Sequence, residues 1–146
     1  MPLNQPETPD IPVVEPWPLA TSAILRVLAW PRYEDIESIK RVLMVAEPLF
    51  DNSKGCLCLR HDAERDIPYE QAVLQLQNAF DAMALTGDLE VLFITEEMRE
   101  ADWPRLAKSL SAMIQVDSIL DETRRSCIES LSANGLEIIG LENPSS

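Results

Sequence analysis

Short apolar segments alternate strictly with amphipathic segments along this chain, and this alternation constrains the fold more than any other feature. Five runs rich in β-forming residues are separated by four stretches with apolar residues at helical spacing. Strands that alternate with helices assemble into a parallel sheet with right-handed crossovers. The sequence therefore predicts an α/β fold, a three-layer α/β/α sandwich with a mainly parallel five-stranded sheet, Rossmann-like or flavodoxin-like. The expected strands and helices are, in chain order, 23–29, 34–50, 55–60, 68–86, 89–95, 102–114, 115–120, 122–133 and 136–140.

Two of these strands carry an indication of their place in the sheet. The segment LEVLFIT (89–95) is apolar on both faces, which is typical of a central parallel strand covered by helices above and below. The segment QVDSIL (115–120) is more polar, and we expect it nearer an edge. Gly87 follows the helix expected at 68–86 and predicts a left-handed exit from it.

The chain is long enough for one domain with its own core. Residues 1–20 are rich in proline and lack basic residues, which predicts an extended leader. Apolar side chains such as Trp17 indicate that part of this leader lies against the domain. We expect the single α/β domain to span 21–141 and a frayed tail to occupy 142–146.

The charge of the chain argues against whole classes of partner. Twelve basic residues face 25 acidic ones, for a formal net charge of −13. Nucleic-acid binders need a basic surface, so we expect no nucleic-acid partner, and an anionic membrane surface is disfavoured for the same reason. No apolar run approaches the roughly 18 residues of a membrane span, and no secretory signal is recognisable. A cytoplasmic protein is the resulting expectation.

The cysteines and the histidine limit metal and redox chemistry. Cys56 and Cys58 lie two apart on one expected strand, and Cys127 lies on a distant helix. An odd number of cysteines without a secretion signal argues against a disulfide framework, so we expect buried structural thiols. With one histidine in the chain, the sequence predicts no metal site.

Ligands of open α/β sheets bind beyond the carboxyl ends of the strands, so the turns there hold the candidate binding residues. Arg32 and Tyr33 follow the first strand, where they are placed to stack on a base or sugar or, alternatively, to cap the next helix. Arg60 ends the second strand and would offset the charge of a phosphate. The rim is otherwise dominated by carboxylates.

Two further candidates follow the second and third strands. His61 with Asp62 would form a base with its orienting acid, and the alternative is a polar loop. Glu96 with Glu97 would bind a cation or act in acid–base chemistry, and the alternative is a solvated approach to a helix. The ligand-binding candidates are Arg32, Tyr33, Arg60, His61 and Glu96, and no residue is assigned a catalytic role.

Motifs that would define a specific chemistry are missing from the sequence. The four glycines do not form a dinucleotide fingerprint or a P-loop, which makes backbone cradling of a pyrophosphate improbable. No G-x-S-x-G elbow of a hydrolase occurs. We therefore expect no bound cofactor.

The segments VLAWPRYEDIESI, AFDAMALTGDLEVLFI and WPRLAKSLSAMIQVDSI carry a family resemblance. Over about 24 to 140 the chain resembles the carboxyl-terminal, donor-binding lobe of two-lobed (GT-B type) glycosyltransferases, as found in cyanobacterial multidomain glycosyltransferase and tetratricopeptide proteins. Such a lobe implies a nucleotide-sugar partner. The first turn, however, has Arg32 but lacks the glycine that such lobes usually carry there.

Two functional hypotheses follow. The first is a glycosyltransferase-like, Rossmann-type domain that acts as an accessory or vestigial nucleotide-sugar-binding lobe, because transfer itself needs both lobes around the reacting carbon. The second is a non-catalytic α/β interaction module with a protein partner. The missing glycine loop favours the second hypothesis and the resemblance favours the first. Whether the chain is an enzyme stays open at this point, as does its oligomeric state.

Overall fold

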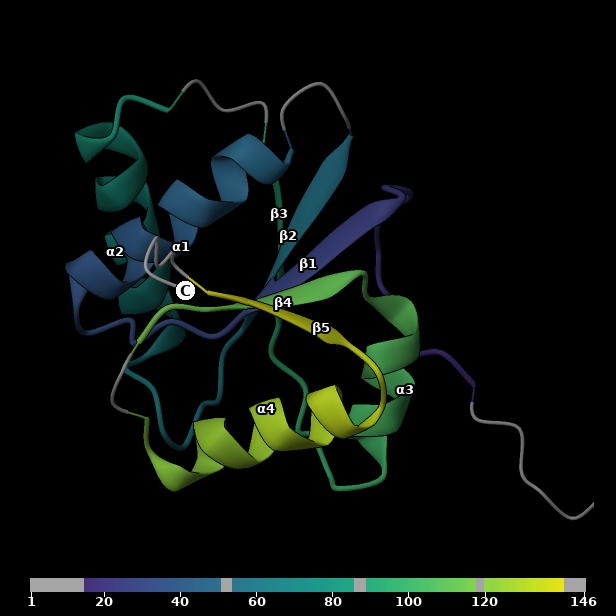
Figure 1. Cartoon of the computed structure of the whole chain (residues 1–146). Helices are drawn as coiled ribbons and strands as arrows, with labels where there is room; N and C mark the ends of the chain where they lie inside the picture. Colours follow the sequence, from purple (N-terminus) through teal and green to yellow (C-terminus); the bar gives the residue numbers. More distant parts are fainter. Residues whose placement is uncertain (1–14, 51–53, 86–88, 118–119, 141–146) are drawn as a thin grey trace, which may run out of the picture.

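The structure, a computed structural model, describes residues 15–50, 54–85, 89–117 and 120–140 (Figure 1). It contains five strands and four helices in strict alternation, which confirms the predicted α/β fold. The elements are β1 (Leu25–Ala29), α1 (Ile36–Leu49), β2 (Gly55–Arg60), α2 (Tyr69–Ala82), β3 (Glu90–Ile94), α3 (Asp102–Ser109), β4 (Ala112–Gln115), α4 (Glu122–Ala133) and β5 (Glu137–Gly140).

The strands lie in the order β3-β2-β1-β4-β5, and every neighbouring pair is parallel. Helices α1 and α2 cover one face of the sheet while α3 and α4 cover the other, giving three layers (Figure 1). The chain moves outward from β1 through β2 to β3 and then returns past β1 to form β4. The strand order therefore reverses between β1 and β4, where ligands of doubly wound sheets usually bind.

The expected positions of two strands in the sheet are wrong. The sequence pattern placed 89–95 at the centre, but β3 is an edge strand. The strand expected at 115–120 and near an edge shares only Gln115 with β4, which spans Ala112–Gln115 and pairs with both β1 and β5. Apolar side chains on both faces of a strand are typical of burial above and below the sheet. They do not show whether another strand pairs with its second side. Val91, Leu92 and Phe93 of β3 are only half-buried.

Two helix ends also differ from the expectation. Helix α3 ends at Ser109, and Ala112–Ile114, expected to be helical, pair with β1 instead. Pairing of apolar residues with a central strand thus overrides the helical periodicity of that segment. Helix α2 ends at Ala82, and the left-handed residue after it is Ala84, with φ of 55°. Gly87, the expected exit, lies outside the described residues.

Local capping signals predict both ends of α4 correctly, but α1 and α2 differ from the expectation: Asp35 caps α1, in place of Arg32 or Tyr33, and α2 starts after Pro68 without a side-chain cap. Asp35 and Asp121 are the N-caps of α1 and α4, and each side chain accepts a hydrogen bond from a backbone N–H of the first turn. Asn134 is the C-cap of α4, and Gly135 follows with φ of 89°. Pro48 lies in the last turn of α1, as expected.

The core lies between the sheet and both helical layers. The three thiols are all buried and free, which confirms the expectation of structural cysteines. Burial raises the pKa of Cys127 to about 12. Such a thiol is a poor nucleophile at neutral pH.

The described end of the leader lies against α3, as the apolar Trp17 predicted. The Trp17 N–H donates to the Arg105 carbonyl over 3.0 Å, and the Ser109 hydroxyl donates to the Trp17 carbonyl. The Arg105 guanidinium lies 5.1 Å from the centroid of the Trp17 ring. Residues 1–14 of the leader and 141–146 at the other end fall outside the described residues.

Candidate functional site

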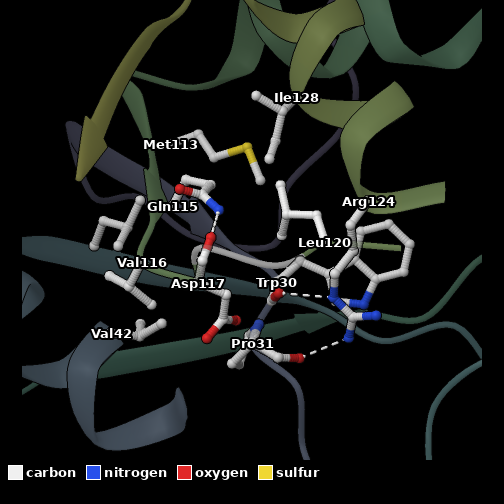
Figure 2. A pocket seen from close by; sticks show the side chains of 11 residues that line it. Trp30, Pro31, Val42, Met113, Gln115, Val116, Asp117, Leu120, Arg124 and Ile128 are labelled. Atoms are coloured by element: carbon white, nitrogen blue, oxygen red, sulfur yellow. Dashed lines mark hydrogen bonds between the residues drawn. The ribbon is translucent and has the colours of Figure 1, made fainter. Parts of the chain in front are cut away.

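The crevice between the carboxyl ends of β1 and β4 is the position where this fold usually binds its ligand, and here it is nearly filled (Figure 2). We call it the switch crevice. Its free volume is about 10 Å³, about the space of a single water molecule. The lining residues are Trp30, Pro31, Val42, Met113, Ile114, Gln115, Val116, Asp117, Leu120, Arg124 and Ile128.

A carboxylate of the protein occupies the amino end of α1, where a bound phosphate would be favoured. Asp117 follows β4, and its side chain is 4% exposed. The Ser38 hydroxyl donates to Asp117 Oδ2 over 2.8 Å, and Arg41 Nη2 donates to Oδ1 over 2.8 Å. The Arg32 N–H donates to Ser38 Oγ and thereby links the turn after β1 to this network. Asp117 thus binds two side-chain donors of α1, and Asp35 accepts from the Glu37 N–H, so the anion-binding groups of this helix end are used internally.

Arg124 of α4 fills the other side of the switch crevice. Its guanidinium donates to Asp66 Oδ1 over 2.7 Å and to Asp121 Oδ2 over 2.7 Å. It also donates to the carbonyls of Trp30 and Pro31, and it lies 4.7 Å from the Trp30 ring centroid (Figure 2). Burial lowers the pKa of Arg124, but the two carboxylates outweigh burial and raise it overall. The positive charge of Arg124 is therefore balanced by Asp66 and Asp121, and its side chain fills this side of the switch crevice. Arg124 offers a phosphate little electrostatic attraction.

Arg32 and Tyr33, the two candidates in the turn after β1, lie in different environments. Arg32 is half-exposed, and its guanidinium pairs with Glu34 over 3.4 Å. Tyr33 is fully buried, and its hydroxyl donates to the Arg60 carbonyl over 2.5 Å. Burial, followed by the nearby Asp66 carboxylate, raises the pKa of Tyr33. Tyr33 packs inside the protein, and a base or sugar has no access to its ring.

The Arg60 side chain contacts the backbone of Glu96 and not its side chain. Arg60 is 3% exposed, and its Nη1 donates to the carbonyls of His61, Ile94 and Glu96 over 3.1, 3.1 and 2.7 Å. Burial lowers the pKa of Arg60. These bonds fasten the carboxyl end of β3 to that of β2. The Glu96 side chain is exposed at the rim.

His61 is 2% exposed, and its Nε2 lies 2.7 Å from the Ile67 carbonyl oxygen. It belongs to a group of rings beside β3 in which Tyr69 makes edge contacts with His61 and Phe93, at centroid distances of 5.7 and 5.2 Å. Tyr33 contacts His61 and Phe93 from within the core, at 5.6 and 6.3 Å. The aromatic group thus extends from the core to the surface.

A pocket of about 580 Å³ opens next to these rings, and we call it the edge pocket. It lies where β2 runs into α2 and where β3 forms the edge of the sheet. Tyr69, 43% exposed, is one of its aromatic walls. The lining residues are His61, Ala63, Pro68, Tyr69, Val91, Leu92, Phe93 and Thr95.

Of the predicted candidates, only His61 lines the edge pocket, and the residues that shape the two sites were mostly missed. Asp117 was missed because β4 was expected to start three residues later in the chain. The expected carboxyl end of that strand therefore lay beyond this aspartate. Tyr69 and Phe93 escaped notice because β3 was expected at the centre of the sheet. The signal that could have revealed Asp117 is an aspartate shortly after the apolar residues 112–114, in AMIQVD.

Comparison with known proteins supports the fold and goes no further. No protein-family model matches the sequence, and no curated protein matches it significantly. Among solved structures the chain is similar to a universal stress protein in complex with cAMP, with a TM-score of 0.50 and 12% sequence identity. The similarity covers 83% of this chain and 98% of that one. A likeness at this identity shows a shared Rossmann-like α/β architecture, because one fold hosts many functions.

Two further observations concern the described part of the chain. None of its helices combines the length and apolar character needed to cross a membrane. Its histidine, cysteine, aspartate and glutamate side chains form no group of three or more suited to hold a metal ion.

Proposed function

We propose that this chain is a non-catalytic α/β interaction module that binds an apolar or aromatic group of a partner in the edge pocket. The observation that carries the proposal is the contrast between two places on one sheet: the edge pocket measures about 580 Å³ and the switch crevice about 10 Å³. Sites that enclose organic ligands commonly measure about 300–1,000 Å³ and are lined mainly by apolar and aromatic side chains.

The chemistry of the edge pocket suits binding better than catalysis. Tyr69 and Phe93 offer aromatic surface to a bound group of the partner. Contacts between aromatic rings contribute about 0.5–1.5 kcal/mol of binding free energy beyond the effect of area burial. His61, the imidazole at the pocket, already has a backbone carbonyl as the partner of its Nε2. No serine or cysteine is among the lining residues to act as a nucleophile beside it.

A second candidate is the nucleotide-sugar-binding lobe that the sequence resemblance implies. A Rossmann-like sheet with a reversal of strand order supports it, as does a structural neighbour in complex with cAMP. The filled switch crevice weighs against it, because Asp117 and Arg124 would have to give up buried partners before a phosphate could enter. We rank it second for that reason.

Indole serves as the probe for an aromatic side chain. Its binding to the full chain is monitored by NMR of the ¹⁵N-labelled protein. Indole should shift the amides of Tyr69, Phe93 and Thr95 with a dissociation constant of about 1 mM, equivalent to about −4.1 kcal/mol. Tyr69→Ala should weaken binding about fivefold. Leu74→Ala, also on α2 and 56% exposed, is the matched control outside the pocket and should leave binding unchanged.

Failure to shift these amides, or equal binding by the Tyr69→Ala variant, would show the proposal to be wrong. UDP-, GDP- and ADP-sugars are tested in parallel by thermal unfolding. A nucleotide sugar at a hundred times its dissociation constant would add about 2.7 kcal/mol of stability. Such a shift, absent with indole, would make the nucleotide-sugar lobe the better proposal.

A further inference from the structure

The open edge of β3 lies along the edge pocket, and the two together define the form of the partner. We infer that the partner is an extended peptide segment that pairs with β3 as a sixth strand and inserts an apolar side chain beside Tyr69; this inference rests on the proposed function. Four of the eight residues that line the edge pocket come from β3 or directly follow it, namely Val91, Leu92, Phe93 and Thr95.

The backbone of β3 is oriented for such pairing. The Ile94 carbonyl accepts from the His61 N–H over 3.0 Å, so the polar groups of Ile94 face β2. Successive residues of a strand direct these groups to opposite sides, which turns the N–H and C=O of Val91 and Phe93 away from β2. Within the described residues no strand pairs with that side. An added strand would satisfy these groups, as in other cases of β-strand addition.

Apart from Glu90 at its start, β3 lacks the usual protection of an edge strand. Natural edges are blunted by lysine, proline or a β-bulge. From Glu90 to Ile94 the strand contains neither lysine nor proline, and its register with β2 runs without interruption. Val91, Leu92 and Phe93 of β3 are only half-buried, and an added strand would cover more of their apolar surface.

The charged side chains around β3 indicate which kind of partner strand would bind. Glu90 lies at the start of β3, and Glu96, Glu97 and Glu100 follow it, all of them exposed, against one exposed basic residue, Arg99. A partner segment with basic residues at its ends therefore complements both ends of β3. A second copy of this chain is disfavoured, because it would bring the same carboxylates together and carries a net charge of −13 itself.

The probe is a synthetic peptide, acetyl-Lys-Val-Thr-Tyr-Val-Thr-Lys-amide, titrated into the full chain by NMR. Two analogues carry backbone N-methyl groups, one on the odd-numbered and one on the even-numbered inner residues. Alternate amides of a strand point to opposite sides, so one analogue should lose binding at least tenfold while the other keeps it. Loss in both analogues, or in neither, would overturn the inference.

Two controls separate this inference from the proposed function. If indole binds while the peptide does not, or if both analogues bind like the parent peptide, strand pairing is wrong but the edge pocket remains a binding site. If neither indole nor the peptide binds, both proposals fail.

Replacing the terminal lysines of the peptide with glutamates tests the charge of the partner. This change should weaken binding at least tenfold at low salt, and 0.5 M NaCl should reduce that difference. If the glutamate peptide binds as tightly as the lysine peptide at low salt, the inference that the partner is basic is overturned.

A variant of the protein tests the same geometry. Val91→Pro removes an outward N–H and should abolish peptide binding, whereas Leu74→Ala, which lies outside the edge pocket, should retain it. Proline is tolerated at edge-strand positions whose N–H faces outward. A folded Val91→Pro variant that binds the peptide normally would overturn the inference. If that variant does not fold, the N-methyl analogues decide.

Discussion

Arg124 and Asp66 are 58 residues apart in the chain, yet their guanidinium and carboxylate groups lie 2.7 Å apart inside the protein. Their side chains are 5% and 1% exposed. Asp66 also accepts from the Trp30 indole N–H over 2.9 Å, so the pair holds together the turn after β1, the segment before α2 and the start of α4. This junction closes the site that doubly wound sheets generally use for ligands.

Removing one member of this pair should be costly. Arg124→Ala leaves the Asp66 carboxylate buried without its cation, and we expect a loss of about 3–5 kcal/mol in the free energy of unfolding. Arg125→Ala, an exposed neighbour on the same helix, is the control and should change stability by about 0.5 kcal/mol or less. Chemical denaturation measures both. A cost below about 1 kcal/mol for Arg124→Ala would contradict the role assigned to the pair.

Asp117 should behave as a built-in substitute for a bound anion. Asp117→Ala removes the acceptor of Ser38 and Arg41 and should lower stability by about 1–3 kcal/mol. Inorganic phosphate should then raise the melting temperature of the variant more than that of the wild type, at matched ionic strength, because the freed donors can bind it. Glu34→Gln, at an exposed carboxylate in the turn after β1, serves as the control. Equal responses to phosphate in all three proteins would count against this prediction.

Gly55 is required by the ring of Phe50. A Cβ built on Gly55 would lie 1.9 Å from Cδ1 of Phe50, so the ring must move when any side chain is added. We expect Gly55→Ala to cost about 1–3 kcal/mol of unfolding free energy through overpacking. In the background of Phe50→Ala, the same substitution should cost much less, and a double-mutant cycle measures the difference. Additive effects would show that the two residues do not conflict.

The buried thiol of Cys127 should make stability depend on alkaline pH. Burial raises its pKa from the ordinary value of 9.0 to about 12 in the folded protein. Its contribution is therefore complete below pH 9 and is lost as the pH rises from 9 to 12, with a slope of about 1.4 kcal/mol per pH unit.

The slope is measured by denaturation at several pH values in the wild type and in Cys127→Ala. Tyr33 and Cys58, whose pKa values are also raised by their surroundings, titrate in both proteins and cancel in the comparison. The variant should show the flatter dependence on pH. Identical slopes would mean that Cys127 ionises as readily in the folded state as in the unfolded chain.

Local signals in the sequence explain why much of the fold could be predicted. Helical periodicity and the caps at Asp121 and Gly135 depend on residues a few positions apart, and the structure confirms them. The same kind of signal failed at 112–114, because pairing with β1 outweighs helical spacing there. The candidate site was predicted less well: His61 borders the edge pocket, whereas Tyr33 and Arg60 are buried and bonded within the protein.

The amino-acid sequence by itself determined the alternation of strands and helices, and with it a parallel sheet between two helical layers, because burial pattern and handedness act locally along the chain. The tertiary structure decided the lateral order of the strands, which leaves β3 at an edge and brings Asp117 and Arg124 into the switch crevice. These outcomes depend on contacts between residues far apart in the chain. Periodicity reports which faces of a segment are buried, but it carries no information about which strand lies beside it.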